Sequence, residues 1–599
     1  MNFLYSNKKE KISKIRLNIL QLGIFLLIII IIIRLFYIQI IKHKKYKELA
    51  SHQHLVIKDI KPNRGEIFSL SSEDGDILIP LVVNQVYYEV SVDPLEITRF
   101  RNISDILAEI LDLDSDEIYE KIRSKNKRYE RILNNVSEEK IEVLKEKLNL
   151  LLEDINKDKS TKDKVNTTGV YWKKEVLRYY PDKDIGSHIL GFLGFSKDGY
   201  SRVGKYGLEA YWEKELAGIS GKIEGEKSLS GKLLSFTNNK SDVEHGADLI
   251  LTIDHNIQYA ACKSLERAVI NYDAKSGTVI IMDTKTGSIK AMCNYPSFDP
   301  NKYNEVETSD IYNNNAVYYN YEPGSVMKSI SMAIAIDTEK VSADTLYKDE
   351  GEIKFAGGWI IKNSDLKAHG LVDMTEVLAA SLNTGIIFAT SEIHNKVFED
   401  YMKKFGFGEL TGILISQDNK GDISKLSKKG DINKATASYG QGVTVTPLQM
   451  LNAINVLANS GNLVKPYIIN KINYTDNIIE TFEPKVIRRV VSSGTASTLS
   501  AMMVNVVDSG HAIKAGVDGY YVAGKTGTAQ VVNKDTKRYD INKTIHNFVG
   551  FAPVENPKFT MITKLDSPTA ARFSADTAAP LFGEIAKFLL EYYNIPPSR

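Results

Sequence analysis

The sequence predicts an α+β protein that carries a single membrane-spanning helix near its N-terminus. Three observations favour this class. An apolar run lies within the first 40 residues, strand-like segments occur at both ends of the C-terminal half, and the segments between them show the apolar spacing of helices. A sheet that pairs the two ends of such a region, with helices between them, is an α+β arrangement.

Composition narrows the possible classes. Charged residues make up 25% of the 599 positions and the formal net charge is +1, so neither bulk disorder nor a generally basic nucleic-acid-binding protein is indicated. The two cysteines, Cys262 and Cys293, form no C-x-x-C pattern, which argues against a zinc site or a disulfide framework. They could pair in an extracytoplasmic domain, but we expect two small buried thiols. No pattern indicates a metal or an organic cofactor.

Residues 17–40 are expected to form the membrane anchor. The run is almost wholly apolar apart from Arg34, and its length suits one transmembrane helix. No small-x-small cleavage site follows, which favours a retained anchor over a cleaved signal peptide. Basic residues flank the span on both sides in similar number, so the positive-inside rule does not decide the orientation. A short tail before one span fits a signal anchor, with residues 1–16 cytoplasmic and the chain after about residue 40 outside.

Residues 41–245 are expected to form an N-terminal domain of mixed elements. The predicted elements are a juxtamembrane helix and a strand within 41–60, a strand at 86–93, helices through 103–155 and an exposed loop at 153–168. The polar stretch 237–246 reads as a linker, which places the main domain boundary between residues 245 and 246.

The remaining residues, 246–599, are expected to form the second domain. Its predicted strands are 248–254, 278–283, 288–292, 546–552 and 559–563, and its outer helices are 258–272 and 580–593. The strands lie at the two ends of this region and the helical segments lie between them. The sheet should therefore join the N-terminal and C-terminal parts of the domain.

The first chemical motif is Ser325-Val-Met-Lys328. Proline and glycine immediately upstream set a turn, so Ser325 should lie in the first turn of a helix that runs to Ile336. The spacing of three places Lys328 on the same face, within reach of the hydroxyl. A buried lysine can shift toward neutrality and act as a base for serine, and helix N–H groups can support an oxyanion. Taken alone, S-x-x-K is common at the start of surface helices.

The second motif is Ser381-Leu-Asn383, in an apparent turn between helical segments. A hydroxyl there could pass a proton between Lys328 and a leaving amine, and the Asn383 amide could hold a peptide carbonyl. The same pattern is also an ordinary helix N-cap.

The third motif is Lys525-Thr-Gly-Thr528, which follows a strand-like segment. Glycine here lets a substrate backbone approach an edge strand, and Lys525 with Thr526 and Thr528 could bind a terminal carboxylate. The stretch from Gly519 to Thr526 formally matches a phosphate-binding loop. Its interior is strand-forming, however, and no helix follows, so that reading is rejected.

The order and spacing of the three motifs resemble those of the class B penicillin-binding proteins, which are monofunctional D,D-transpeptidases. Leu382 stands where the S-D-N form of the second motif has aspartate. Further similar segments in the catalytic half are Tyr295–Asn301, Tyr321–Lys328, Tyr439–Gln449 and Phe548–Pro553. Those in the N-terminal half are Arg64–Glu66, Arg178–Pro181, His188–Gly191 and Gly207–Glu209. The resemblance covers nearly the whole chain after the anchor.

This resemblance implies an elongated, dimerisation-like pedestal over 41–245 and a transpeptidase domain over 246–599 with a central antiparallel sheet flanked by helices. It also implies an acyl-enzyme mechanism. Ser325 would attack the D-Ala-D-Ala bond of a peptidoglycan stem peptide with Lys328 as base, Ser381 would relay the proton, and Asn383 would orient the substrate.

In the same reading, Lys525, Thr526, Gly527 and Thr528 would bind the substrate and its C-terminal carboxylate. The backbone N–H groups of Ser325 and Thr528 would form the oxyanion hole. A neighbouring stem peptide's amine would then take the acyl group, and β-lactams would trap Ser325 as a slow ester. The pedestal matches are expected to be structural or partner-facing.

Other readings fit less well. A β-lactamase would need a deacylating glutamate loop, and a bifunctional synthase would need a glycosyltransferase domain; neither has a matching segment. A non-enzymatic penicillin sensor or scaffold would not need the intact motifs.

Division, elongation and sporulation types share these motifs, and Gly204–Glu209 with the Ile-Pro-Pro ending favours the division type. We expect a single-pass bacterial membrane protein with an extracytoplasmic catalytic domain, which works with a membrane-embedded glycosyltransferase and divisome or elongasome proteins, without nucleic acid.

Overall fold

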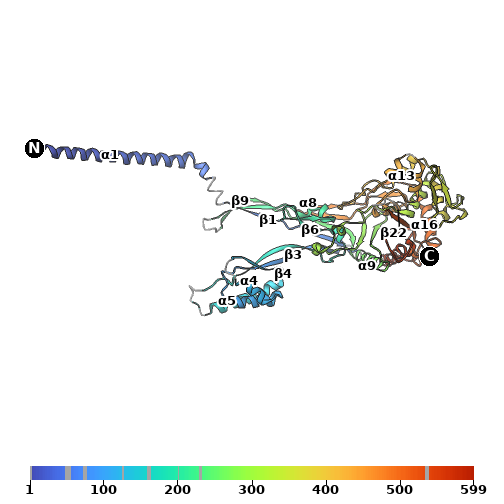
Figure 1. Cartoon of the computed structure of the whole chain (residues 1–599), viewed down its shortest axis with the longest axis horizontal. Helices are drawn as coiled ribbons and strands as arrows, with labels where there is room; N and C mark the ends of the chain where they lie inside the picture. The colour runs from blue at the N-terminus through green and yellow to red at the C-terminus, as the bar shows by residue number, and fades with distance from the viewer. Residues whose placement is uncertain are drawn as a thin grey trace. The chain divides into compact units, whose positions relative to one another are not determined.

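The computed structural model describes residues 3–47, 55–71, 77–123, 127–157, 159, 164–199, 201–227, 233–428, 430–532 and 539–599. The chain forms two compact units (Figure 1). The first comprises Met1–Asn63 with Gly218–His245, and the second comprises Arg64–Ala217 with Gly246–Arg599. The second unit thus contains residues from both sides of the domain boundary that we expect between 245 and 246. That boundary stays a prediction.

The first unit contains the apolar helix and a small sheet. Helix α1 (Phe3–Phe36) continues into the π-helical turn η1 (Tyr37–Ile41), and the segment Lys14–Ile41 has the length and composition of a membrane span, with a mean hydropathy of 2.9. The sheet has the order β1–β8–β9, with β1 (Leu55–Ile60), β8 (Gly221–Lys227) and β9 (Leu233–Ser241).

The structure of this unit differs from the sequence prediction at its C-terminal segment. The linker expected over 237–246 is wrong for its first five residues, because they belong to β9, and Lys240 and Ser241 among them pair with β8. The juxtamembrane helix expected after residue 40 falls partly on residues 48–54, which lie outside the described residues.

The pedestal part of the second unit, residues 64–217, is built around the long strand β3, which pairs with β2, β4 and β5. Its strands are β2 (Ile67–Leu70), β3 (Leu78–Val92), β4 (Glu130–Ser137), β5 (Val170–Tyr179), β6 (Phe192–Phe195) and β7 (Arg202–Lys205). Its helices are α3 (Phe100–Leu111), α4 (Ser115–Ile122), α5 (Glu138–Asn156), α6 (Ser187–Leu190), α7 (Gly207–Tyr211) and α8 (Glu213–Ala217).

The expectation of helices through 103–155 is wrong at β4. This strand stands antiparallel to β3 with Val136 opposite Tyr88, and both side chains enter the core beneath α3 and α5. Pairing with β3 makes this segment a strand, and a local Leu/Glu/Lys pattern does not reveal a partner so far away in the chain. The exposed loop expected from residue 153 begins later, because α5 extends to Asn156.

A buried ion network lies at the base of the pedestal part. Glu209 has no exposed surface and accepts hydrogen bonds from Arg64 Nε at 2.8 Å and Arg178 Nε at 2.7 Å. Burial opposes ionisation of the Glu209 carboxyl, but the two arginines outweigh it and lower the pKa of that group. The network joins the segment before β2 to β5 and α7, which are distant in sequence, so it is a structural feature of the pedestal part.

The C-terminal part of the second unit, residues 246–599, contains a five-stranded antiparallel sheet in the order β12–β11–β23–β22–β21. These strands are β11 (Ser276–Asp283), β12 (Ile289–Tyr295), β21 (Ala523–Val532), β22 (Tyr539–Ala552) and β23 (Phe559–Asp566). The predicted pairing of the two ends of this region in one sheet is confirmed.

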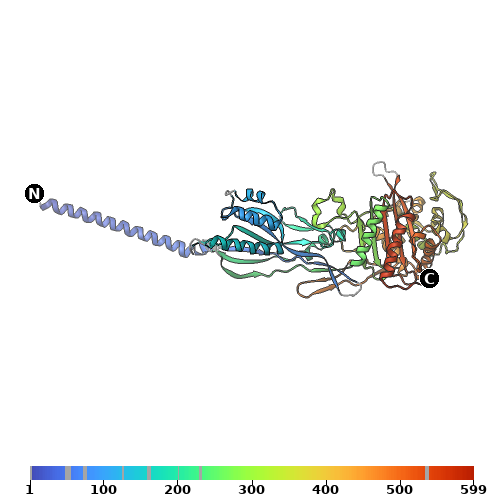
Figure 2. The ribbon, with the colours of Figure 1, turned by 90° about the horizontal axis from the view of Figure 1, so that it is seen from below.

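Helices cover both faces of this sheet. Helices α9 (His255–Asn271) and α17 (Ala578–Tyr592) lie side by side on one face (Figure 2). On the other face lie α15 (Pro447–Ala458) and α16 (Ser493–Asp508). The hydroxyl of Thr560 contacts Asn455 of α15, whereas that of Thr563 donates to the Ala578 carbonyl of α17, so the two helix pairs take opposite sides of β23.

Further helices fill the middle of the C-terminal part and several short strands lie outside the central sheet. The helices are α10 (Met327–Asp337), α11 (Met374–Ala379), α12 (Asn383–Ser391), α13 (Asn395–Lys404) and α14 (Asp431–Ser438). The strands are β10 (Asp248–Asp254), β13 (Tyr347–Asp349), β14 (Glu352–Lys354), β15 (Ile360–Lys362), β16 (Gly370–Val372), β17 (Asn462–Val464), β18 (Ile469–Asn473), β19 (Ile479–Thr481) and β20 (Val486–Arg489).

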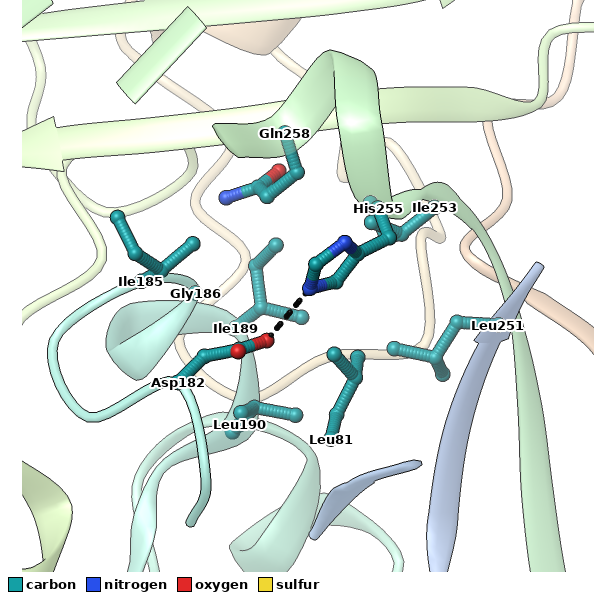
Figure 3. Close-up of a pocket in the computed structure, with 10 residues that line it drawn as sticks. All are labelled: Leu81, Asp182, Ile185, Gly186, Ile189, Leu190, Leu251, Ile253, His255 and Gln258. Carbon is teal, nitrogen blue, oxygen red and sulfur yellow. Dashed lines mark hydrogen bonds and ion pairs between the residues drawn. The ribbon is translucent and has the colours of Figure 1, made fainter. Parts of the chain in front are cut away.

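The pedestal part and the C-terminal part share a sheet and a small pocket. Strand β10 pairs in parallel with β2 and antiparallel with β18. Beside it, His255 Nε2 lies 2.9 Å from the carboxylate of Asp182 in a mainly apolar pocket (Figure 3). The hydrogen bond to Asp182 is the main cause that raises the pKa of His255.

Cys262 and Cys293 form a disulfide, with a Cα–Cα distance of 5.2 Å. The expectation of two free buried thiols is therefore wrong. The cysteines lie 31 positions apart in sequence. They meet because α9 packs on β12, a contact that sequence spacing alone does not reveal.

Candidate active site

Ser325 lies in a short 3₁₀ turn, η4 (Gly324–Val326), that leads into α10. Gly324 has a φ of +58°, which a residue with a side chain rarely adopts, and a Cβ at this position would lie 3.1 Å from the Thr528 carbonyl oxygen. The turn therefore presses against the edge of β21. Ser325 is half-buried, while α10 behind it is almost wholly buried, unlike the surface helix that a chance motif would begin.

Lys328 reaches from α10 to the second motif. Its side chain has no exposed surface, and its Nζ donates to the Ser381 carbonyl and lies 3.2 Å from Ser381 Oγ. Within the described part of the chain, no hydrogen bond joins Lys328 to Ser325. Contact between these two side chains stays a prediction.

Ser381 is the meeting point of the three motifs. It occupies the predicted turn between α11 and α12 and has a φ of +59°, a conformation that costs a non-glycine residue free energy and is often found at functional sites. Its Oγ lies 3.0 Å from Lys525 Nζ as well as 3.2 Å from Lys328 Nζ. The structure thus brings two lysine side chains together on one hydroxyl.

The electrostatics of this pair are unusual, because both lysines are completely buried and neither forms an ion pair with any described residue. Burial, reinforced by the nearby Lys525 charge, lowers the pKa of Lys328 well below its ordinary value. Burial also lowers the pKa of Lys525, to about 7. A lysine shifted in this way is neutral often enough to accept a proton from a hydroxyl.

Asn383 begins α12, and its side-chain Nδ2 donates to the Lys362 carbonyl of β15 at 2.8 Å. The next residue, Thr384, is anchored by a buried network, since its Oγ1 lies 2.6 Å from Asp349 Oδ1 and 2.9 Å from Asn363 Oδ1, with one hydroxyl proton between the two acceptors. This network holds the start of α12 against the small strands. Sequence reasoning missed Asp349 and Asn363, which carry no motif.

The third motif lies on β21, the edge strand of the central sheet. Lys525 and Thr526 are buried, whereas Thr528 is half-buried. A Cβ at Gly527 would lie 2.6 Å from the Pro323 carbonyl oxygen, so only glycine lets the strand approach the turn before Ser325 this closely. Asn547 on β22 reinforces the contact, because its Nδ2 lies 3.2 Å from the Gly527 carbonyl and 3.4 Å from that of Pro323.

Strand geometry also bears on the predicted oxyanion hole. The Thr528 carbonyl faces Gly324 across the outer edge of β21. In an extended strand the N–H and C=O groups of one residue point to the same edge, so the Thr528 N–H faces the turn that carries Ser325. The arrangement agrees with an oxyanion site between these two backbone groups.

The site therefore unites a serine at a helix start, two buried lysines, a hydroxyl between them, an amide and a hydroxyl-bearing edge strand. Among the described residues, no group of three His, Cys, Asp or Glu side chains is placed to hold a metal ion. The combination suits acyl transfer through a covalent serine ester, with lysine rather than histidine as the base.

Comparisons with known proteins agree on the family. Residues 277–587, just over half of the chain, match the penicillin binding protein transpeptidase domain, and residues 59–251 match the penicillin-binding protein dimerisation domain. Stage V sporulation protein D of Bacillus subtilis is 30% identical over 98% of this chain and 87% of its own length. Peptidoglycan D,D-transpeptidase FtsI of Escherichia coli is 26% identical over 94% of this chain and 89% of its own.

Solved structures show the same architecture. Penicillin binding protein 2X from Streptococcus thermophilus has a TM-score of 0.75 at 21% identity, with 90% of this chain and 80% of that chain covered. The apo form of penicillin binding protein 3 from Mycobacterium tuberculosis has a TM-score of 0.63 at 29% identity, with 71% and 92% covered. With the fold, the apolar helix and both domain matches in agreement, the chain belongs to the class B penicillin-binding proteins, which are serine-type D-Ala-D-Ala transpeptidases of peptidoglycan.

Proposed function

We propose that Ser325 is the nucleophile of this transpeptidase. The observation that carries the proposal is the convergence of Lys328 and Lys525 on Ser381 Oγ, with Lys328 one helical turn after Ser325. A neutral Lys328 takes the Ser325 proton as the hydroxyl attacks the penultimate carbonyl of the stem peptide. The negative charge on the carbonyl oxygen is held by the backbone N–H groups of Ser325 and Thr528.

The remaining residues complete the cycle. Ser381 passes the proton to the leaving D-alanine nitrogen, which departs as the free amino acid, and Asn383 holds the peptide. The Lys525 ammonium with Thr526 and Thr528 binds the terminal carboxylate, while Gly527 admits the peptide backbone to the strand edge. The amine of a second stem peptide then attacks the Ser325 ester and loses its proton through the same relay. This step restores the serine and forms the cross-link.

The catalytic half is proposed to lie outside the membrane, with α1 as the anchor. The disulfide supports this side, because such bonds persist in oxidising compartments. We assign the enzyme to septal wall synthesis with a membrane-embedded glycosyltransferase, on the pedestal segment Gly204–Glu209 and on the FtsI names among its relatives. A fluorescent fusion should gather at division sites, and signal along the side walls or only in sporulating cells would overturn the septal assignment.

Fluorescent penicillin tests the nucleophile directly. The wild-type chain should be labelled covalently and Ser325→Ala should not be labelled, because no ester can form. Ser329→Ala is the matched control, since it removes a buried hydroxyl of α10 that has no described hydrogen-bond partner and should leave labelling intact. Labelling of Ser325→Ala, or labelled peptides that map elsewhere, would contradict the assignment.

A further inference from the structure

The hydroxyl of Thr528 is contacted by a residue from outside the three motifs. Ser574 lies in the short 3₁₀ turn η7 (Ser574–Asp576), is 2% exposed, and meets Thr528 twice. Its backbone N–H donates to Thr528 Oγ1 at 3.2 Å, and its own Oγ lies 3.0 Å from the same atom. Neither residue type nor spacing in the sequence indicates this contact.

The contact with Ser574 limits the hydrogen bonds that the Thr528 hydroxyl can form. A threonine hydroxyl has one proton to donate and two lone pairs that accept. The Ser574 N–H occupies one lone pair of Thr528 Oγ1. When the Ser574 hydroxyl donates to the second, Thr528 can act only as a donor, and its proton must point to another acceptor. A carboxylate, which only accepts hydrogen bonds, is the matching partner.

The turn that carries Ser574 is tied firmly to the sheet. His546 stands opposite Thr528 in the β21–β22 ladder, so the two side chains share one face of the sheet. Its Nδ1 lies 2.8 Å from the Thr577 hydroxyl and its Nε2 lies 3.0 Å from that of Thr544. Burial lowers the pKa of His546 to about 4, so the imidazole is neutral at ordinary pH. Ser574 is thereby held in place through Thr577.

We propose that Ser574 is a positioning residue that orients the Thr528 hydroxyl as a donor to the terminal carboxylate of the D-Ala-D-Ala stem peptide or of a β-lactam. The inference rests on the proposed function, because Thr528 is one of the groups assigned there to the carboxylate. Ser574 itself touches no substrate atom and acts only through Thr528.

The test compares a cephalosporin, cephalothin, with its methyl ester, which lacks the carboxylate charge. Second-order acylation rate constants are measured on the full-length protein. Ser574→Ala should lower the constant for the acid by about five- to tenfold and change that for the ester less than twofold, since one oriented hydrogen bond to a charged group is lost. An equal fall for both compounds would indicate a merely structural role, and no change for the acid would overturn the proposal.

Three variants sharpen this result. In a Thr528→Val background, Ser574→Ala should cause no further loss, whereas an additive loss would show that Ser574 acts elsewhere. Ser500→Ala is the matched control, because this buried serine donates to the Ala496 carbonyl of its own helix and both rate constants should be unchanged. If Ser574→Ala does not fold, Ser574→Cys keeps the backbone donor with a weaker side-chain donor and should lower the acid-to-ester ratio partially. Failure of the proposed function itself would appear separately, as absence of any acylation at Ser325.

Discussion

Two clusters of basic side chains lie in the same compact unit and differ in whether a carboxylate accompanies them. In the pedestal part, Arg64 and Arg178 are held by the ionised Glu209. Beneath the candidate nucleophile, Lys328 and Lys525 converge on the neutral hydroxyl of Ser381, with no ion pair to any described carboxylate. The first arrangement keeps every group in its ordinary charge state. The second pushes lysine toward neutrality, so the uncompensated cluster is the one suited to chemistry.

The largest expected effect comes from removing a lysine. Lys328→Met keeps the length of the side chain but cannot accept a proton, and should lower the acylation rate constant for penicillin by about a hundredfold to ten-thousandfold. Because Lys328 is buried without a partner charge, the same change should not lower the melting temperature. Acylation and thermal unfolding are measured on one preparation. A variant that keeps its acylation rate would remove Lys328 from the base role.

In the pedestal part, a substitution is expected to lower stability and to leave acylation unchanged. Glu209→Gln leaves the buried Arg178 guanidinium without a negative partner and Arg64 with Glu213 alone, and should lower the free energy of unfolding by about 3–5 kcal/mol. Urea unfolding measures the change, and penicillin labelling of the fraction that stays folded should be retained. Full stability with lost labelling would mean that the Glu209 cluster serves catalysis rather than folding.

A smaller effect on the acylation rate constant is expected when the pH is raised. The pKa of Lys525 is lowered to about 7 by burial, so its ammonium is lost as pH rises through that value in the free enzyme. Since the proposed role of this ammonium is to bind the carboxylate, the second-order acylation constant should fall by up to about tenfold per pH unit above 7. The methyl ester should show a weaker decline. A constant that is flat or rises between pH 7 and 9 would show that Lys525 does not act as the carboxylate's cation.

Sequence patterns anticipated the elements whose signals are local. The strand expected at 248–254 coincides with β10, and the turn expected at Ser381 lies between two helices. Strand β4 was missed because its partner β3 lies some forty residues away in the chain. The disulfide was missed for the same kind of reason, since it depends on α9 packing against β12.

The candidate site divides in the same way. Its motif residues were found because S-x-x-K, S-x-N and K-T-G follow one another in this order along the chain. Asn547, Asp349 and Ser574 were not found, because each is an ordinary polar residue whose importance lies in what it touches. Their partners are separated from them by tens to hundreds of positions, and no periodicity records such contacts.

The sequence by itself determined the apolar helix, the succession of strands and helices at the ends of the catalytic half, and the chemical groups of the candidate active site. These follow from hydrophobic periodicity and from residue types at fixed spacing, which are local properties of a chain. Only the tertiary structure decided that two lysines 197 positions apart share one serine hydroxyl and that both are buried without a counter-charge. Their low pKa values are a property of the surroundings, because burial and neighbouring charge act through space.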